Sequence, residues 1–143
     1  NKGNSEKLVV RKNIVEQVAS VRIFPGIQKE VFQAVANIPN LKGLILETYG
    51  SGNAPTFNWL TEELLRLNEK GVILVNVTQC NTGKVMQGKY ETGAHLERAG
   101  VLSGEDMTYE AAITKLMYLL SCEELSLEEK KKYMGINLRG ELS

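Results

Sequence analysis

The sequence predicts an α/β domain of three layers, in which a mainly parallel sheet is flanked by helices. Short apolar segments alternate with helical stripes along the chain, as in parallel strands joined by right-handed crossovers. The segment 72–77 is nearly continuous in apolar, mostly β-branched residues, as expected of a strand that helices cover on both faces. With 143 residues, the chain is long enough for one domain with a substantial core.

The first strand and the first helix are predicted near the start of this pattern. Val21–Phe24 is rich in β-branched and aromatic residues and ends at a Pro-Gly pair. Residues 27–37 carry apolar side chains at a spacing of four, which indicates a helix with one face toward the core. These apolar positions are Ile27, Val31 and Val35.

Two further strands enclose a second helix. Leu44–Leu46 is the next predicted strand, and the segment that begins at Val72 is the third. Between them, residues 56–70 are predicted to be helical, with Thr56 as the N-cap and Gly71 just after the end. The apolar stripe of this helix is Leu60, Leu64 and Leu67.

The next segment is less regular. Residues 81–93 contain three glycines and no clear period, so we expect an ordered loop. A short helix over 93–99 and a brief fourth strand at 101–102 are predicted to follow.

Two helices are predicted to end the chain. Residues 108–121 give the clearest helical stripe, and Asp106 or Thr108 can cap its start. Ser126 and Glu129 form a capping-box pattern that opens a last short helix. The apolar stripe of the longer helix is Ile113, Leu116, Met117 and Leu120.

The amino-terminal residues are predicted to precede the domain. Residues 1–20 are weakly patterned and are interpreted as a lead-in and interdomain link, with a candidate edge strand at 8–10. Residues 21–143 are interpreted as the domain itself. Because the chain begins with Asn rather than Met, we expect it to be a fragment of a longer protein.

Composition and charge exclude several classes of protein. Hydrophobic residues make up 43% of the chain and charged residues 24%, and the formal net charge is zero. This balance gives no attraction to nucleic acid or to an anionic membrane, so neither is expected as a partner. No apolar run approaches the roughly 20 residues of a membrane-spanning helix. Two distant cysteines and one histidine predict no disulfide framework and no metal site.

A glycine-rich loop follows the second strand, where open parallel sheets place their ligands. Residues 50–53 are Gly-Ser-Gly-Asn, and Asn53 can both donate and accept hydrogen bonds, which suits a carboxylate or an amide. From the pattern alone, a tight turn in which Asn53 bonds its own backbone is favoured. Pro55 excludes a dinucleotide fingerprint, and Tyr49 excludes a nucleophile elbow around Ser51.

Polar residues also follow the third strand. Thr78, Gln79 and Cys80 come directly after the apolar run, where they need polar partners or solvent, and they can bind a small polar ligand. Cys80, with no histidine near it in sequence, is interpreted as a buried structural thiol. From the pattern alone, Tyr90 is interpreted as anchoring its own loop rather than as donating a hydrogen bond to a ligand, and His95 is expected to be exposed.

Several separate motifs extend in a fixed order from about Val21 to Leu142, nearly the whole chain. They include LILETYGSGNAP at 44–55, VTQC at 77–80, AGVLSG at 99–104 and NLRGEL at 137–142. Together they resemble the carboxy-terminal domain of bacterial cytosolic (type I) L-asparaginases. The resemblance implies a flavodoxin-like domain from a cytoplasmic enzyme that hydrolyses L-asparagine to L-aspartate and ammonia without metal or cofactor.

The resemblance also implies that this chain lacks the nucleophile. In the family, a larger amino-terminal domain carries a nucleophilic threonine in a Thr-Gly-Gly-Thr segment and a Thr-Asp pair, and neither sequence occurs here. Family members are homodimers or homotetramers in which the smaller domain of one subunit completes the neighbouring active site. Asn53 and Tyr90 match the residues that contribute to the neighbour's site. The isolated chain is therefore expected to be inactive.

Some bacterial members bind asparagine at a regulatory site near these strand ends. The resemblance places Glu47, Thr78, Gln79 and Cys80 at the corresponding positions, but the family's arginine is replaced by Glu47. A glutamate repels the carboxylate that an arginine would hold with two hydrogen bonds. Regulation by asparagine is therefore not expected.

Two alternative functions remain open. The same pair of domains occurs in amidotransferase subunits that act on mischarged transfer RNA and in an asparaginase-like lysophospholipase. The chain could also be a stand-alone module that binds an amino acid or a small carboxylate. Upstream sequence discriminates among these, because an added RNA-binding domain or an ankyrin-type extension would favour the first two.

Overall fold

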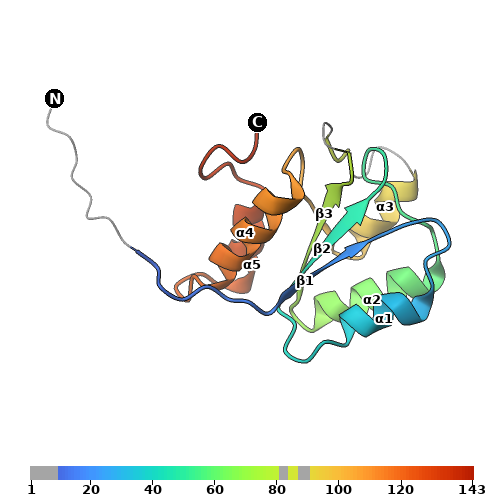
Figure 1. The fold of residues 1–143 in the computed structure, drawn as a ribbon, viewed down its shortest axis with the longest axis horizontal. Helices are drawn as coiled ribbons and strands as arrows, with labels where there is room; N and C mark the ends of the chain where they lie inside the picture. The colour runs from blue at the N-terminus through green and yellow to red at the C-terminus, as the bar shows by residue number, and fades with distance from the viewer. Residues whose placement is uncertain (1–9, 81–83, 87–90) are drawn as a thin grey trace, which may run out of the picture.

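The structure confirms an α/β domain built on a parallel sheet. The computed structural model describes residues 10–80, 84–86 and 91–143. Within these residues, four strands lie in the order β1-β2-β3-β4, and all neighbouring pairs are parallel. The arrowheads of β1, β2 and β3 point to the same edge of the sheet in Figure 1. The strands are β1 (Val18–Arg22), β2 (Gly43–Thr48), β3 (Ile73–Thr78) and β4 (Leu102–Ser103).

The helices form a layer on each face of the sheet. Because the strands follow one another in sequence order and crossovers are right-handed, all three connecting helices lie on one face. The opposite face is covered by the two helices that follow the last strand (Figure 1). The connecting helices are α1 (Lys29–Ala36), α2 (Asn58–Glu69) and α3 (Glu91–Arg98), and the two others are α4 (Tyr109–Leu120) and α5 (Leu127–Met134). None of the helices in the described part of the chain is long and apolar enough to span a membrane.

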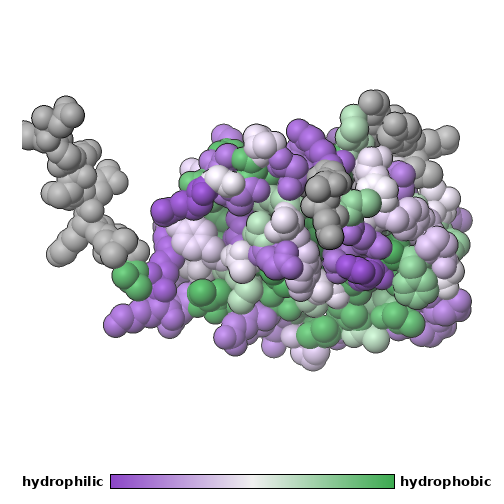
Figure 2. All heavy atoms as spheres, turned by 45° about the horizontal axis from the view of Figure 1, so that its top comes forward, coloured by the Kyte–Doolittle hydropathy of each residue, from purple (hydrophilic) through white to green (hydrophobic). Residues whose placement is uncertain are grey.

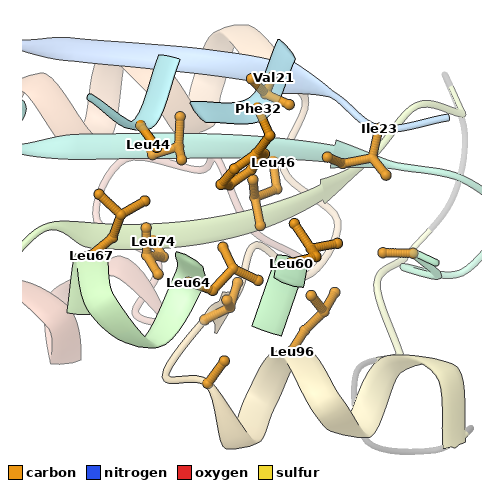
Figure 3. Packing of buried hydrophobic residues seen from close by; sticks show 14 of the residues in the cluster. Val21, Ile23, Phe32, Leu44, Leu46, Leu60, Leu64, Leu67, Leu74 and Leu96 are labelled. Carbon is orange, nitrogen blue, oxygen red and sulfur yellow. The ribbon is translucent and has the colours of Figure 1, made fainter. Parts of the chain in front are cut away.

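The core beneath α1, α2 and α3 follows the alternation of side chains along the strands. Val21, Leu44, Leu46 and Leu74 point from three neighbouring strands to this layer (Figure 3). The helices pack Phe32, Leu60, Leu64, Leu67 and Leu96 against them, which confirms the predicted leucine stripe.

The core on the other face uses the intervening strand residues. Ile45, Ile73, Val75 and Val77 pack against α4 and α5. A Cβ atom at Gly43 would lie 2.6 Å from a methyl carbon of Leu116, so the glycine lets α4 approach the backbone of β2 closely.

The apolar stripe predicted for the first helix is wrong at Val31. The helix begins after Ile27, and Val31 is 51% exposed. Phe32 points to the core instead and packs against Trp59 of α2, with 6.0 Å between ring centroids. The larger aromatic side chain buries more area, and it therefore sets the rotation of the helix.

The helix starts were predicted correctly in two cases. The side chain of Thr108 caps α4, and Ser126 forms a reciprocal capping box with Glu129 at the start of α5. The prediction for α2 was wrong, because Phe57 rather than Thr56 is the N-cap and no side chain bonds there.

The end of α2 was also predicted correctly. Gly71 has a φ of +83°, which a glycine adopts without strain. Its N–H bonds to the carbonyl of Asn68 at 3.0 Å, and the N–H of Val72 bonds to the carbonyl of Leu67 at 3.1 Å. This pair of hydrogen bonds is the Schellman arrangement, and it turns the chain directly into β3.

The first strand begins earlier than predicted. β1 starts at Val18, within the segment interpreted as the lead-in, and residues 10–17 precede it without regular structure. Val10 belongs to no strand, and the remainder of the candidate edge strand lies outside the described residues. Arg11 pairs with Glu124 and lies 5.5 Å from the ring centroid of Tyr118, so this segment is held against α4. The boundary at residue 20 stays a prediction.

The stripe predicted for α4 is rotated by about one residue. Leu116 is buried as predicted, whereas Ile113, Met117 and Leu120 are only partly buried. The buried face consists of Ala112, Lys115, Leu116 and Leu119. A buried lysine could not be predicted from periodicity, because it depends on a partner distant in the sequence.

That partner is Glu141 in the carboxy-terminal turn. Lys115 Nζ lies 2.6 Å from a Glu141 carboxylate oxygen and also donates to the carbonyl of Ile136 at 2.6 Å. Burial by itself would raise the pKa of Glu141. Hydrogen bonds from Lys115 and from the N–H groups of Leu138 and Arg139 outweigh that effect and lower the pKa to about 2.

Glu141 should make the stability of the protein depend on pH between about 4.5 and about 2. Its pKa is lower in the folded state, so the ionised carboxylate stabilises the fold above the unfolded pKa. This contribution is lost as the pH falls through the folded pKa. The urea midpoint should therefore fall more steeply in the wild type than in Glu141→Gln. The exposed Glu123→Gln is the control and should follow the wild type; parallel curves for all three proteins would contradict a stabilising ion pair.

Candidate functional site

The candidate site lies at the edge of the sheet where the parallel strands end. β2 and β3 are paired in register up to Thr48 and Thr78, so the loops that follow both strands meet there. Figure 2 turns this edge toward the viewer, and its surface mixes hydrophilic and hydrophobic residues. The site residues predicted after both strands are thus brought together, as expected of the carboxyl edge of a parallel sheet.

The loop after β2 is a tight turn. The backbones of Tyr49 and Asn53 exchange two hydrogen bonds, of 3.1 Å and 2.9 Å, as an isolated antiparallel bridge. Gly50 and Gly52 have φ values of +58° and +102°, which explains the two glycines. Asn53 stands at the end of the turn and is partly exposed. The tight turn predicted from the pattern is confirmed, and it presents Asn53 at the strand ends. The predicted hydrogen bond of Asn53 to its own backbone stays a prediction.

A buried polar network supports this turn from below. The Thr48 hydroxyl donates to Asn76 Oδ1 at 2.6 Å, and Asn76 Nδ2 donates to the carbonyl of Gly52 at 3.2 Å. Thr48 and Asn76 are both fully buried. Sequence reasoning missed these two residues, although polar side chains inside otherwise apolar strands are a usable signal, because such groups must find partners.

The residues after β3 hold the strand ends together. Thr78 donates its hydroxyl hydrogen to the carbonyl of Gly50 at 2.7 Å and accepts from the N–H of Cys80 at 3.1 Å. The Gln79 side-chain amide donates to the carbonyls of Ile23 and Glu47 at 2.6 Å and 2.8 Å. Both predicted residues therefore make structural contacts at the site.

Glu47 has a positively charged partner. Its carboxylate lies 3.1 Å from a guanidinium nitrogen of Arg22, on the neighbouring strand, and its side chain is 15% exposed. The Arg22 side chain is 64% exposed. Glu47 thus neutralises the arginine on β1 that could otherwise hold an anion at this edge.

The short segment 84–86 packs against the turn. Val85 is 1% exposed, and its γ carbon would lie 2.7 Å from a Cβ atom built on Gly52. The N–H of Met86 donates to the carbonyl of Ser51 at 2.9 Å. Lys84 is exposed and pairs with Glu105 at 2.9 Å. Sequence reasoning missed Val85, since nothing in a loop without periodicity singles it out.

Two predictions about single residues are wrong, and one lies outside the described residues. Cys80 is exposed, because it lies two residues beyond the end of β3, and the buried thiol is Cys122. His95 is only 7% exposed, because α3 begins earlier than predicted and places it in the interior of the helix. Tyr90 lies outside the described residues.

The described site can bind but shows no nucleophile paired with a base. It offers the side-chain amide of Asn53, backbone groups of a glycine turn and the Arg22–Glu47 pair. Such groups suit a small ligand with amide or carboxylate groups. Among the residues that the structure describes, no group of three His, Cys, Asp or Glu residues could hold a metal ion.

Comparison with known proteins agrees with the fold. The chain is 45% identical over 137 residues to L-asparaginase 1 of Escherichia coli (strain K12), covering 96% of this chain and 40% of that protein. It is 42% identical over 136 residues to the 60 kDa lysophospholipase of Mus musculus, covering 95% of this chain and 24% of that protein. The chain thus spans well under half the length of these relatives.

A solved structure and a family model give the same assignment. The crystal structure of L-asparaginase I from Vibrio cholerae O1 biovar eltor str. N16961 matches with a TM-score of 0.83 and 46% identity, covering 89% of this chain and 38% of that chain. The family model of the glutaminase/asparaginase C-terminal domain matches residues 17–134. Because this match takes in most of the chain, the protein belongs to the glutaminase/asparaginase C-terminal domain family.

Proposed function

We propose that this chain is the C-terminal domain of a longer L-asparaginase, which hydrolyses L-asparagine to L-aspartate and ammonia. The observation that carries the proposal is the identity of 45% and 46% to two L-asparaginases over nearly the whole chain. The nucleophilic threonine belongs to the upstream part of the protein. It attacks the side-chain amide carbon of asparagine and releases ammonia, and water then hydrolyses the acyl-enzyme to aspartate.

The role of this domain is to bind rather than to react. Asn53, on the turn after β2, supplies a hydrogen-bonding amide to the active site of a neighbouring subunit, and Tyr90 supplies a second polar contact there. Such contacts act by fixing the orientation of the substrate. A site that a neighbouring subunit completes requires a homo-oligomer, and its ligand is a small amino acid. The proposed location is the cytoplasm, as in the family that the sequence resembles.

An ammonia-release assay tests whether the nucleophile lies in the upstream part of the protein and not in this domain. The full-length protein should release ammonia from asparagine, and the 143-residue chain alone should not, because no Thr-Gly-Gly-Thr segment is present. Activity in the chain alone would mean that it contains a nucleophile, and the proposed role would be wrong.

Asn53→Ala in the full-length protein should impair hydrolysis of asparagine. Loss of one positioned hydrogen bond should raise the KM or lower the kcat by about tenfold. Asn68→Ala is a matched control, since Asn68 lies near the opposite end of α2 and accepts a hydrogen bond from Lys131. Steady-state kinetics with unchanged constants for Asn53→Ala would remove this residue from the site.

The full-length protein should show hyperbolic kinetics. At the edge of the sheet, Glu47 neutralises the charge of Arg22. Arg22 is therefore not free to hold the carboxylate of an effector. Initial velocities plotted against asparagine concentration should give a Hill coefficient near one. A clearly sigmoidal curve would show that effector binding survives with Glu47, Thr78, Gln79 and Cys80 in place.

A lysophospholipase function is the second candidate, because a relative of that name is 42% identical over nearly the whole chain. The two candidates differ in the substrate, one a small amino acid and the other a lipid ester. Parallel assays of the full-length protein with asparagine and with lysophosphatidylcholine separate them. Hydrolysis of the lipid alone would overturn the proposed asparaginase function.

A further inference from the structure

The turn that carries Asn53 belongs to a closed ring of hydrogen bonds. Asn76 Nδ2 donates to the carbonyl of Gly52 at 3.2 Å, and the carbonyl of Asn76 accepts from the N–H of Gly104 at 2.7 Å. The next residue, Glu105, accepts from the N–H of Val85 at 2.8 Å. Met86 then donates to Ser51, which precedes Gly52, and so closes the ring at 2.9 Å.

Chemistry fixes the orientation of the Asn76 side chain in this ring. The carbonyl of Gly52 can only accept, so the amide nitrogen of Asn76 must face it. The amide oxygen then faces the Thr48 hydroxyl, which must donate, and does so at 2.6 Å. The carbonyl of Gly52 therefore sets the direction in which Asn76 presents its N–H groups, and Thr48 holds that direction by donating to the amide oxygen.

Close packing leaves little freedom within the ring. A Cβ atom at Gly104 would lie 2.6 Å from the backbone oxygen of Asn76, and one at Gly52 would lie 2.7 Å from Val85. Both values are well inside van der Waals contact, so these glycines mark places where backbone and side chains meet directly. Asn76 is fully buried at the centre and makes two of the ring's hydrogen bonds.

We propose that Asn76 is a positioning residue that fixes the orientation of Asn53 and couples the turn at 50–53 to the loop at Gly104–Glu105. The carbonyl that Asn76 holds belongs to the peptide bond between Gly52 and Asn53, so a rotation of that peptide would swing Asn53 away from the substrate. The effect of Asn76 on catalysis rests on the proposed function, whereas the coupling of the two loops does not depend on it.

The kinetic test is a double-mutant cycle in the full-length protein. Asn76→Asp keeps the shape and the acceptor for Thr48 but replaces the donor to Gly52 with an oxygen. It should raise the KM for asparagine about tenfold. If Asn76 acts through Asn53, the double variant Asn53→Ala/Asn76→Asp should be no worse than Asn53→Ala alone. Thr48→Val, which leaves Asn76 in place but removes its orienting donor, should show the same lack of additivity.

Controls separate positioning from loss of folding. Asn68→Asp makes the same chemical change at the far end of α2 and should leave the KM unchanged. Melting temperatures identify any variant that fails to fold, and Thr48→Val then carries the cycle. Multiplicative effects of the Asn53 and Asn76 substitutions, or an unchanged KM in Asn76→Asp, would overturn the proposal.

Hydrogen exchange gives a readout that does not depend on activity. In Asn76→Asp, the amides of residues 51–53 and 104–105 should exchange faster together, while those of β1 should stay as in the wild type. Faster exchange in only one of the two loops, or in neither, would refute the coupling. If the coupling is found but asparagine is not hydrolysed, the proposed function fails and the positioning role in the fold remains.

Discussion

The structure depends on one topological constraint, which is that the strands follow each other in sequence order across the sheet. Each right-handed crossover then returns on the same side, so α1, α2 and α3 all cover one face. The other face must be covered by chain that comes after β4. The carboxy-terminal helices α4 and α5 are therefore as essential to the core as the crossovers themselves, because without them Ile45, Val75 and Val77 would face water.

The same constraint creates the candidate site. Parallel strands end at a common edge, and the loops that leave them must satisfy backbone groups that the sheet no longer pairs. Here buried side chains take over that task, since Asn76, held by Thr48, donates to the carbonyl of Gly52 and Thr78 donates to the carbonyl of Gly50. The edge thus holds a turn that side-chain hydrogen bonds fix in place, and a fixed turn of this kind suits the binding of a small polar ligand.

The carboxy-terminal turn packs against the second face of the domain and buries a charged side chain there. Lys115 is buried there and is offset by Glu141, whose carboxylate also accepts backbone hydrogen bonds from the same turn. A buried charge without a partner would destabilise the fold by several kcal/mol. The last residues of the chain are therefore part of the folded domain.

Local sequence patterns predicted most of the helices and strands, and the predictions that were wrong have a common cause. The leucine stripe of α2, its glycine end and the caps of α4 and α5 depend on residues within a few positions of each other, and these predictions were confirmed. The rotation of α1 was not predicted, because Phe32 faces the core to meet Trp59 in another helix. The exposure of Cys80 and the burial of His95 likewise depend on where β3 ends and where α3 begins, not on their neighbours in sequence.

The sequence by itself determined the alternation of strands and helices, the glycine turn before Asn53 and the family. Each of these can be recognised from short segments of neighbouring residues. Only the tertiary structure decided which side chains meet across elements. The pairing of Lys115 with Glu141, of Glu47 with Arg22, and of Thr48 with Asn76 joins residues from 25 to 28 positions apart in sequence. Such contacts follow from the register of the sheet and from the packing of helices on it. Neither the register nor the packing can be predicted from the spacing of apolar residues within one segment.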